Sequence, residues 1–369
     1  MRRLLLVLSP LTLAVLFAVP ATPALAATGQ HAAITITTNA GFSTCGCVTG
    51  GDGTAANPFV IGPWSIRAPS GGTSGWSVKI DNSGGGITDY FNIFGISSTY
   101  NDTNTTDPTI WLVDVGTATT ISGSSSHPTA GNDLGRGIEL DGSSHISIDG
   151  VSYNKGNGIG VYLNGSSNVS INNSKFKATC DMCTPHTGDG IYATGSDHLQ
   201  IGTGADCPAN GPCNDVTYDD GIGVWLQNTH DVVIDHATAD ANDTGGYVLD
   251  GSSTYNVTLE NSSAQGDGNI CFTVNGQRLN SGYFTDLQGG LHLVNGAHTN
   301  TIANDTFTGS AGLGLASGGN GFYANACTGT NQPFSAEAAM GAGNTFSNIC
   351  YSTTNITDTA VLPPSTCKS

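Results

Sequence analysis

A short pattern of apolar residues, a turn residue and a run of Ser, Asn and Asp recurs along this chain. It is clearest in GIELDGSSHISIDGVSY (137–153), GIGVYLNGSSNVSINNSKF (158–176), GIGVWLQNTHDVVIDHATA (221–239) and GGYVLDGSSTYNVTLENSSA (245–264). Looser copies begin at 190, 268 and 290. The turn residues of the seven copies are Gly142, Gly165, Gly195, Asn228, Gly251, Gly276 and Gly296. Their successive spacings of 23, 30, 33, 23, 25 and 20 residues predict a solenoid.

Within each copy the apolar residues alternate with polar ones. Val161 and Leu163 form one such pair and Val169 and Ile171 another, which is the spacing of strands and not of helices. Short strands that stack on their equivalents in the next copy predict a parallel β-helix, filled by aliphatic columns. A leucine-rich repeat would need helical segments, which 52 glycines and 10% charged residues do not favour. The expected columns are Ile138, Val161, Ile191 and Val224, and Ile148, Ile171, Ile201, Ile234 and Leu259.

The segment GGDGTAANPFVIGPWSI (50–66), followed by these repeats, resembles the NosD-like proteins of the pectate-lyase-like superfamily. The resemblance covers nearly all of the chain after residue 26. It implies an all-β, single-domain, right-handed parallel β-helix, in a group that includes carbohydrate-binding proteins and sugar hydrolases. The same repeat carries several chemistries, so it indicates architecture more strongly than activity.

The first 26 residues have the composition of a secretory signal peptide. Two arginines precede an apolar stretch that ends in Ala24-Leu25-Ala26, so cleavage is expected after Ala26. No later apolar run is long enough to span a bilayer, and we expect an extracellular or periplasmic monomer without membrane insertion. We assign 27–70 to an entry cap with the first strands, 71–330 to the coils and 331–369 to an exit cap, in which SAEAAMGAG is the best helix candidate.

Charge and cysteine content limit the partners and the compartment. The formal net charge is −18, and without Arg2 and Arg3 it becomes −20, which excludes nucleic acid as an expected partner. Ten cysteines in an exported chain favour disulfides. The expected local pairs are Cys180 with Cys183 and Cys207 with Cys213, with further pairing among Cys271, Cys327, Cys350 and Cys367, while the state of Cys45 and Cys47 is left open.

Acidic residues recur just before the first strand of successive copies, at Asp189, Asp219, Asp220, Asp243 and Asp267. Stacked coils would align them as one strip, because equivalent positions lie about 4.8 Å apart per coil. Such carboxyl groups could serve as acid and base in glycoside hydrolysis. The structural alternative is that Asp before Gly-Ile is a turn residue that bonds its own backbone. We weigh the two readings evenly for Asp189, Asp219 and Asp220, which flank two inserted loops.

The other candidate residues surround this strip. His186 is the nearest histidine for proton transfer, so the predicted catalytic set is Asp189, Asp219, Asp220 and His186. Lys177, Tyr218, Trp225 and Asp243 are the candidates for substrate binding, and Asp219, Asp220 and Asp243 for a metal, of which calcium is the candidate. Thr187 to Ile191 and Asp219-Asp220-Gly221 resemble two polygalacturonase segments, but the histidine and R-I-K segments of that family are missing.

Two functional hypotheses follow. One is a hydrolase or lyase that acts on an extracellular polysaccharide near the 178–220 loops, and the other is a non-catalytic surface or matrix protein that serves adhesion or sugar binding. The scarcity of Lys and Arg on the coils favours a neutral polysaccharide over an anionic one. A further column is expected to be a structural ladder in the turns: Asp141, Asn164, Gln227, Asp250, Asn275 and Asn295.

Overall fold

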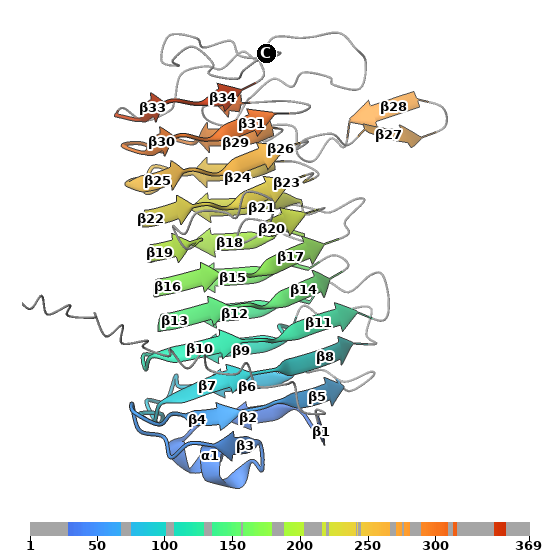
Figure 1. Cartoon of the computed structure of the whole chain (residues 1–369), viewed down its shortest axis with the longest axis vertical. Coiled ribbons are helices and arrows are strands. Elements are labelled where there is room, and N and C mark those ends of the chain that lie inside the picture. The colour runs from blue at the N-terminus through green and yellow to red at the C-terminus, as the bar shows by residue number, and fades with distance from the viewer. Residues whose placement is uncertain are drawn as a thin grey trace, which may run out of the picture.

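The structure is a computed structural model of the chain. It describes residues 29–67, 75–100, 107–128, 135–155, 158–178, 188–202, 216–218, 221–240, 242, 245–265, 271–274, 277–280, 289–308, 313–315 and 343–351. These residues form a tall stack of coils that runs from the N-terminal to the C-terminal end of the molecule (Figure 1). The predicted signal peptide and the predicted helix near 335 lie outside the described residues.

Each coil contributes one strand to each of three sheets, and successive coils pair in parallel. The strands are short because turn residues interrupt the alternating apolar pattern every few positions. The first sheet, sheet B, has 10 strands. In order they are β2 (Ile34–Ile36), β6 (Val78–Asp81), β9 (Ile110–Val113), β12 (Ile138–Asp141), β15 (Val161–Asn164), β18 (Ile191–Thr194), β21 (Ile222–Gln227), β24 (Gly245–Asp250), β29 (Gly289–Val294) and β32 (Leu313–Leu315).

The other two sheets have 11 strands each. Sheet C comprises β3 (Val48–Gly50), β4 (Phe59–Ile61), β7 (Phe91–Phe94), β10 (Thr119–Ser122), β13 (Ser144–Asp149), β16 (Ser167–Asn172), β19 (Asp197–Ile201), β22 (His230–Asp235), β25 (Val257–Glu260), β30 (Thr301–Ala303) and β33 (Thr345–Ser347). Sheet A comprises β1 (Gly29–His31), β5 (Trp64–Arg67), β8 (Ile96–Tyr100), β11 (Ser125–Pro128), β14 (Ser152–Lys155), β17 (Lys175–Ala178), β20 (Val216–Tyr218), β23 (Thr238–Asp240), β26 (Ser263–Gln265), β31 (Thr306–Thr308) and β34 (Cys350–Tyr351).

The interior is filled by the aliphatic columns that the sequence predicts. Ile138 pairs with Val161, Val161 with Ile191 and Ile191 with Val224 in sheet B. The second predicted column, from Ile148 to Leu259, is in register along sheet C. All members of both columns are buried, so the predicted parallel β-helix is confirmed.

A ladder of hydroxyl groups closes the corner between sheets B and C. The backbone N–H of Ser143 donates to Ser166 Oγ at 3.2 Å, that of Ser166 to Ser196 Oγ at 3.1 Å, and that of Ser196 to Thr229 Oγ1 at 3.4 Å. The ladder continues to Thr254. Each buried hydroxyl therefore satisfies a backbone donor of the coil before it, where the strands turn and cannot pair. This explains the first Ser of the repeated G-S-S, at Ser143 and Ser166.

The N-terminal end of the stack is covered by α1 (Asn39–Thr44), which inserts Phe42 into the core. At the N-terminal edge of sheet C, β3 pairs with β4 in the antiparallel direction, which ends the parallel ladder on that side. Cys45 and Cys47, whose state the sequence left open, form a disulfide immediately after α1. The other predicted disulfides involve residues outside the described part or side chains that it does not include.

One predicted copy of the repeat is not a coil. The segment beginning at 268 was expected to stack, but β27 (Cys271–Val274) and β28 (Gln277–Asn280) form an antiparallel hairpin that projects from the side of the stack (Figure 1). Strand β24 pairs directly with β29 instead. The stack also continues through β33 and β34, beyond residue 330. Among the described residues, no helix has the length and apolar character needed to cross a bilayer.

Candidate functional site

The outward face of sheet B carries one large side chain per coil in a continuous column. Residues alternate in and out along a strand, so the residue between two core positions of each strand points away from the core. Sheet register aligns these outward positions from coil to coil. The column consists of Lys79, Trp111, Glu139, Tyr162, Tyr192, Trp225, Val248 and His292.

The two halves of this column differ in exposure. Trp111 and Tyr162, nearer the N-terminal end, are partly exposed. Tyr192 and Trp225 are 7% and 6% exposed and join Ile159, Ile222 and Val248 in a hydrophobic cluster outside the main core. A ligand from solvent can therefore reach Trp111 and Tyr162 more readily than Tyr192 and Trp225, whereas Glu139, between the two exposed rings, is itself buried.

Two cations lie over aromatic rings in the accessible half. Lys79 Nζ is 3.9 Å from the ring centroid of Trp111 and 5.3 Å from that of Trp76. The guanidinium carbon of Arg136 lies 4.2 Å from the ring centroid of Tyr162. Cation–π contacts of this kind hold rings and cations in fixed positions.

A pair of carboxyl groups lies between Trp111 and Tyr162. Glu139 and Asp141 are two residues apart on β12 and so share its outward face. Trp111 Nε1 donates to Asp141 Oδ2 at 2.7 Å, and Arg136 forms an ion pair with Glu139. Burial raises the pKa of Glu139, and the charge and hydrogen bond of Asp141 add to this shift while Arg136 opposes it. We call Lys79, Trp111, Arg136, Glu139, Asp141 and Tyr162 the sheet B site.

The predicted structural ladder is present in the turns of sheet B. Asn164 Nδ2 donates to Asp141 Oδ1 at 3.0 Å, and Gln227 and Asn295 both donate to Asp250, at 3.2 and 2.6 Å. The prediction is therefore confirmed for these five members, while Asn275 lies outside the described residues. Asp141 has a second contact, the Trp111 indole, which the sequence did not reveal.

Three predicted site residues have described side chains. Asp189, immediately before β18, is 3% exposed, and its Oδ1 accepts a hydrogen bond from the Ile222 backbone at 3.1 Å. Burial raises its pKa to about 7, and that hydrogen bond opposes the shift. Trp225 points outward from sheet B but is covered by neighbours. Lys177 lies on β17 in sheet A, so the structure does not bring it together with Trp225 on one sheet.

The remaining predicted site residues, His186, Asp219, Asp220 and Asp243, lie outside the described residues, as does the side chain of Tyr218. Among the described residues no group of three or more His, Cys, Asp or Glu side chains is placed to hold a metal ion. The predicted acidic strip, with calcium as its candidate ion, therefore remains a prediction.

Glu139 and Trp111 were not among the predicted site residues. A signal was present, because aligning GIELDG with GVYLNG and GVWLQN places Glu139 where other copies have Tyr162 or Trp225. A carboxyl group at an otherwise aromatic position marks the site. Trp111 could not be found in this way, because its coil lacks the G-S-S signature of the repeat.

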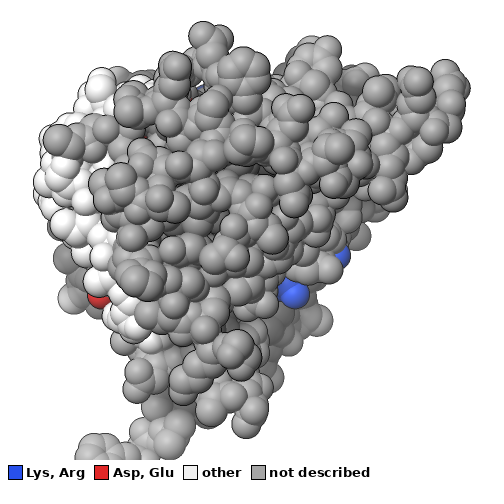
Figure 2. All heavy atoms as spheres, turned by 90° about the horizontal axis from the view of Figure 1, so that it is seen from above, with Lys and Arg blue, Asp and Glu red and all other residues white. Residues whose placement is uncertain are grey.

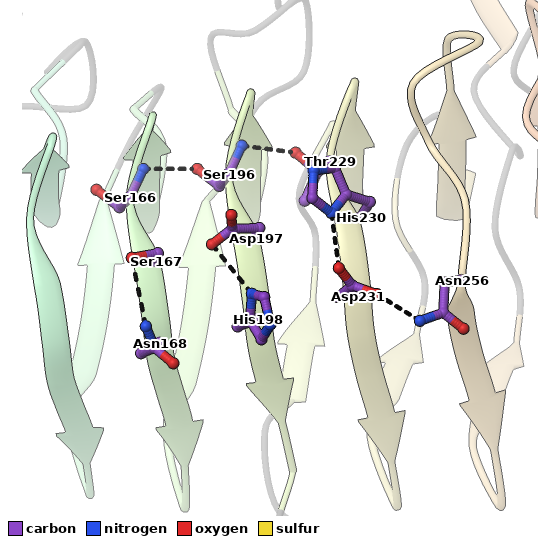
Figure 3. A network of polar contacts seen from close by, with 10 residues as sticks. All are labelled: Ser166, Ser167, Asn168, Ser196, Asp197, His198, Thr229, His230, Asp231 and Asn256. Carbon is purple, nitrogen blue, oxygen red and sulfur yellow. Dashed lines mark hydrogen bonds and ion pairs between the residues drawn. The ribbon is translucent and has the colours of Figure 1, made fainter.

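A second polar cluster lies where the strands of sheet C begin (Figure 3). His198 Nδ1 is 3.3 Å from Asp197, and His230 Nδ1 is 2.9 Å from Asp231, which also accepts from Asn256. These pairs flank the hydroxyl ladder that joins the coils (Figure 3). Tyr255 stacks between His230 and His298, with centroid distances of 4.7 and 5.4 Å. Such stacking between adjacent coils stabilises the corner.

Among the described side chains visible at the C-terminal end of the stack, few are charged (Figure 2). Seen from above, the described side chains that are visible are mainly uncharged, and Lys, Arg, Asp and Glu appear only at the rim (Figure 2).

Comparison with known proteins places the fold. The family described as "Right handed beta helix region" matches residues 136–329, and no curated protein matches the chain. Among solved structures, alginate lyase from Paenibacillus sp. strain FPU-7 is 13% identical with a TM-score of 0.43, covering 78% of this chain and 92% of the lyase. The catalytic domain of a GH87 α-1,3-glucanase in complex with nigerose is 14% identical with a TM-score of 0.48. That match covers 87% of this chain and 58% of the glucanase chain, and neither similarity carries a conclusion about activity.

Proposed function

The chain belongs to the right-handed β-helix family, and we propose that it binds an extracellular polysaccharide through the sheet B site. The observation that carries this proposal is the carboxyl pair held between an indole and a guanidinium on an accessible sheet face. The NosD-like subgroup and secretion, both expected from the sequence, are part of the proposal.

The chemistry of the site suits a sugar. The partly exposed carboxyl group of Asp141 can accept hydrogen bonds from sugar hydroxyls, and the Trp111 indole can pack on the apolar face of a pyranose. Glu139 is buried beneath them and holds Arg136 in place. Trp111 is fixed by Asp141 and Lys79, so little side-chain entropy is lost on binding. The site extends along the stack axis over four adjacent strands, β6, β9, β12 and β15, which favours a chain of sugars over a single sugar.

The test is binding of purified protein to a panel of polysaccharides, measured by affinity electrophoresis and calorimetry. Trp111→Ala should weaken binding about tenfold or more, equivalent to ~1.4 kcal/mol. Tyr255→Ala is the matched control, because it removes an aromatic side chain from the start of sheet C. This variant should leave binding unchanged. Binding that survives Trp111→Ala and Glu139→Gln unchanged would place the sugar elsewhere, and no binding to any polymer would refute the proposal.

Catalysis is a second candidate, favoured by Asp189. A buried carboxyl group with a pKa of about 7 can donate a proton at neutral pH. Glu139 and Asp141 suit glycoside hydrolysis less well, because Arg136 forms an ion pair with Glu139 and the Trp111 indole donates to Asp141, so both carboxyl groups are already engaged. Asp189, with Asp219, Asp220 and His186 as predicted partners, therefore remains the catalytic proposal.

Its test is the release of reducing ends or unsaturated products from the polymers that bind, with and without calcium. An active wild-type protein should lose activity as Asp189→Asn while retaining its binding. Activity that persists in this variant and in Asp219→Asn/Asp220→Asn would exclude these acids as catalytic groups.

A further inference from the structure

We infer that the sheet B site selects uncharged glycans and disfavours polyuronates; this inference rests on the proposed function. A parallel sheet face with two basic side chains could instead be expected to attract carboxylate-bearing sugars. The choice between neutral and anionic glycans depends on whether these two cations are free to pair with a carboxylate of the ligand or are already paired within the protein.

Lys79 is already engaged on several sides. Its Nζ lies 3.1 Å from Asp81 Oδ2, with the rings of Trp111 and Trp76 also in contact. Asp81 is an effective counter-ion because its pKa is lowered, chiefly by the hydrogen bond from the Ser83 side chain. The Ser83 backbone and Lys79 lower the pKa further, while burial partly opposes the shift. A uronate carboxylate would have to displace Asp81 to reach this cation.

Arg136 is engaged in the same manner. Its guanidinium forms an ion pair with Glu139 and lies over the face of Tyr162. Since Glu139 is 5% exposed, removing Arg136 from it would leave a poorly solvated carboxyl group without its cation, which is costly. Arg136 therefore neutralises and positions Glu139, and little of its capacity remains for an anionic ligand.

The remaining charge at the site is negative. The cation of Lys79 pairs with Asp81 and that of Arg136 with Glu139, while Asp141, bonded to the Trp111 indole, adds a further carboxyl group. Two positive and three acidic groups leave a formal charge of −1, within a chain of net charge −18. A polyuronate would be repelled, whereas hydroxyl groups of a neutral glycan would donate to these carboxyl oxygens.

The experiment compares polymers that differ only in charge: polygalacturonate and alginate against their carboxyl-reduced, neutral derivatives, at low and high salt. The neutral member of a pair should bind at least about tenfold more tightly at low salt. High salt should reduce this difference in affinity, because it screens the repulsion between charges. Asp81→Asn frees Lys79 and should raise affinity for the polyuronate severalfold. Asp149→Asn, which makes the same change of charge on sheet C, should leave the ratio unaltered.

The outcomes separate this inference from the proposed function. Polyuronate binding that equals or exceeds neutral binding, and that Trp111→Ala weakens, overturns the selectivity while the proposed site stands. Equal effects of Asp81→Asn and Asp149→Asn would also overturn it, because net charge alone would then account for the preference. Absence of binding to every polymer, or binding indifferent to Trp111→Ala, refutes the proposed function itself.

Discussion

The side chain of Asp189 accepts a hydrogen bond from the backbone N–H of Ile222, on the following coil, at 3.1 Å. This contact links two coils at the point where each coil enters sheet B. It also places a carboxyl group in a buried position, which raises the pKa of Asp189 to about 7.

Stability should therefore fall as the pH rises through this range. The unfolded-state pKa is 3.8, so the folded protein holds more protons between pH 4 and 7, and the stabilisation present at low pH is lost as Asp189 ionises. The expected loss is on the order of 4 kcal/mol. Urea unfolding midpoints measured from pH 4 to 8 should show a shallower decline for Asp189→Asn. An identical slope in the variant would contradict the prediction.

Asp305 should likewise make the free energy of unfolding fall as the pH rises, over a slightly wider pH range. Burial raises its pKa to about 8, although its hydrogen bonds from Ser262 and Ala303 oppose the shift. Asp305→Asn should remove part of the decline that remains in Asp189→Asn up to pH 8. Asp149→Asn, an exchange at an outward position of sheet C, is the control and should leave the pH profile unchanged.

The hydroxyl ladder should contribute measurably to stability. Ser166 Oγ accepts from the backbone of Ser143 and donates to Leu140 O at 2.9 Å, and Ser166 is buried. Ser166→Ala leaves a buried N–H without its acceptor, which costs about 1–3 kcal/mol. Ser170→Ala on the outward face of sheet C should change the unfolding free energy by less than about 0.5 kcal/mol. Equal unfolding midpoints for the two variants would show that the ladder is not stabilising.

The turn between sheets B and C requires a left-handed backbone. Gly165 has φ of +58°, and Asn228, at the equivalent position of a later coil, has φ of +47°. A Cβ at Gly165 would meet no other atom within 4 Å, so the cost of substitution is conformational. Gly165→Ala should destabilise by about 1–2 kcal/mol and Gly165→Asn by less, because Asn tolerates this region. Thermal unfolding would show the difference, and a more stable Ala variant would contradict it.

Core packing should be much more sensitive to truncation than the outward faces. Ile171 is 1% exposed and lies between Ile148 and Ile201 in its column. Ile171→Ala should cost about 2–5 kcal/mol through lost contacts and a cavity. Val233, 41% exposed on sheet C, provides the control, since Val233→Ala should be close to neutral. Similar losses of unfolding free energy in both would mean that the interior is poorly packed.

Most of the coil architecture could be predicted because its signals are local. Alternation in Val161-Tyr-Leu163 and Val169-Ser-Ile171 reports which side chains point inward, and Gly or Asn at the turn reports a left-handed backbone. Alternation and turn conformation both follow from the backbone geometry of single residues. Equivalent residues of successive coils then stack on one another and form the columns. The segment from 271 to 280 was mistaken for a coil because a short apolar strand has the same alternation in a hairpin as in a β-helix.

The site could not be predicted to the same extent. Trp111 and Asp141 meet although they are 30 residues apart, and no local pattern specifies that an indole on one coil bonds a carboxyl group on the next. Asp189 is a second example, since its position before the strand left its exposure open and its surroundings in the folded chain bury it. The sequence by itself thus determined the inward columns and the turns, which depend on backbone geometry repeated in each coil. Only the tertiary structure decided which outward side chains are covered and which meet, because these depend on register between coils and on packing across them.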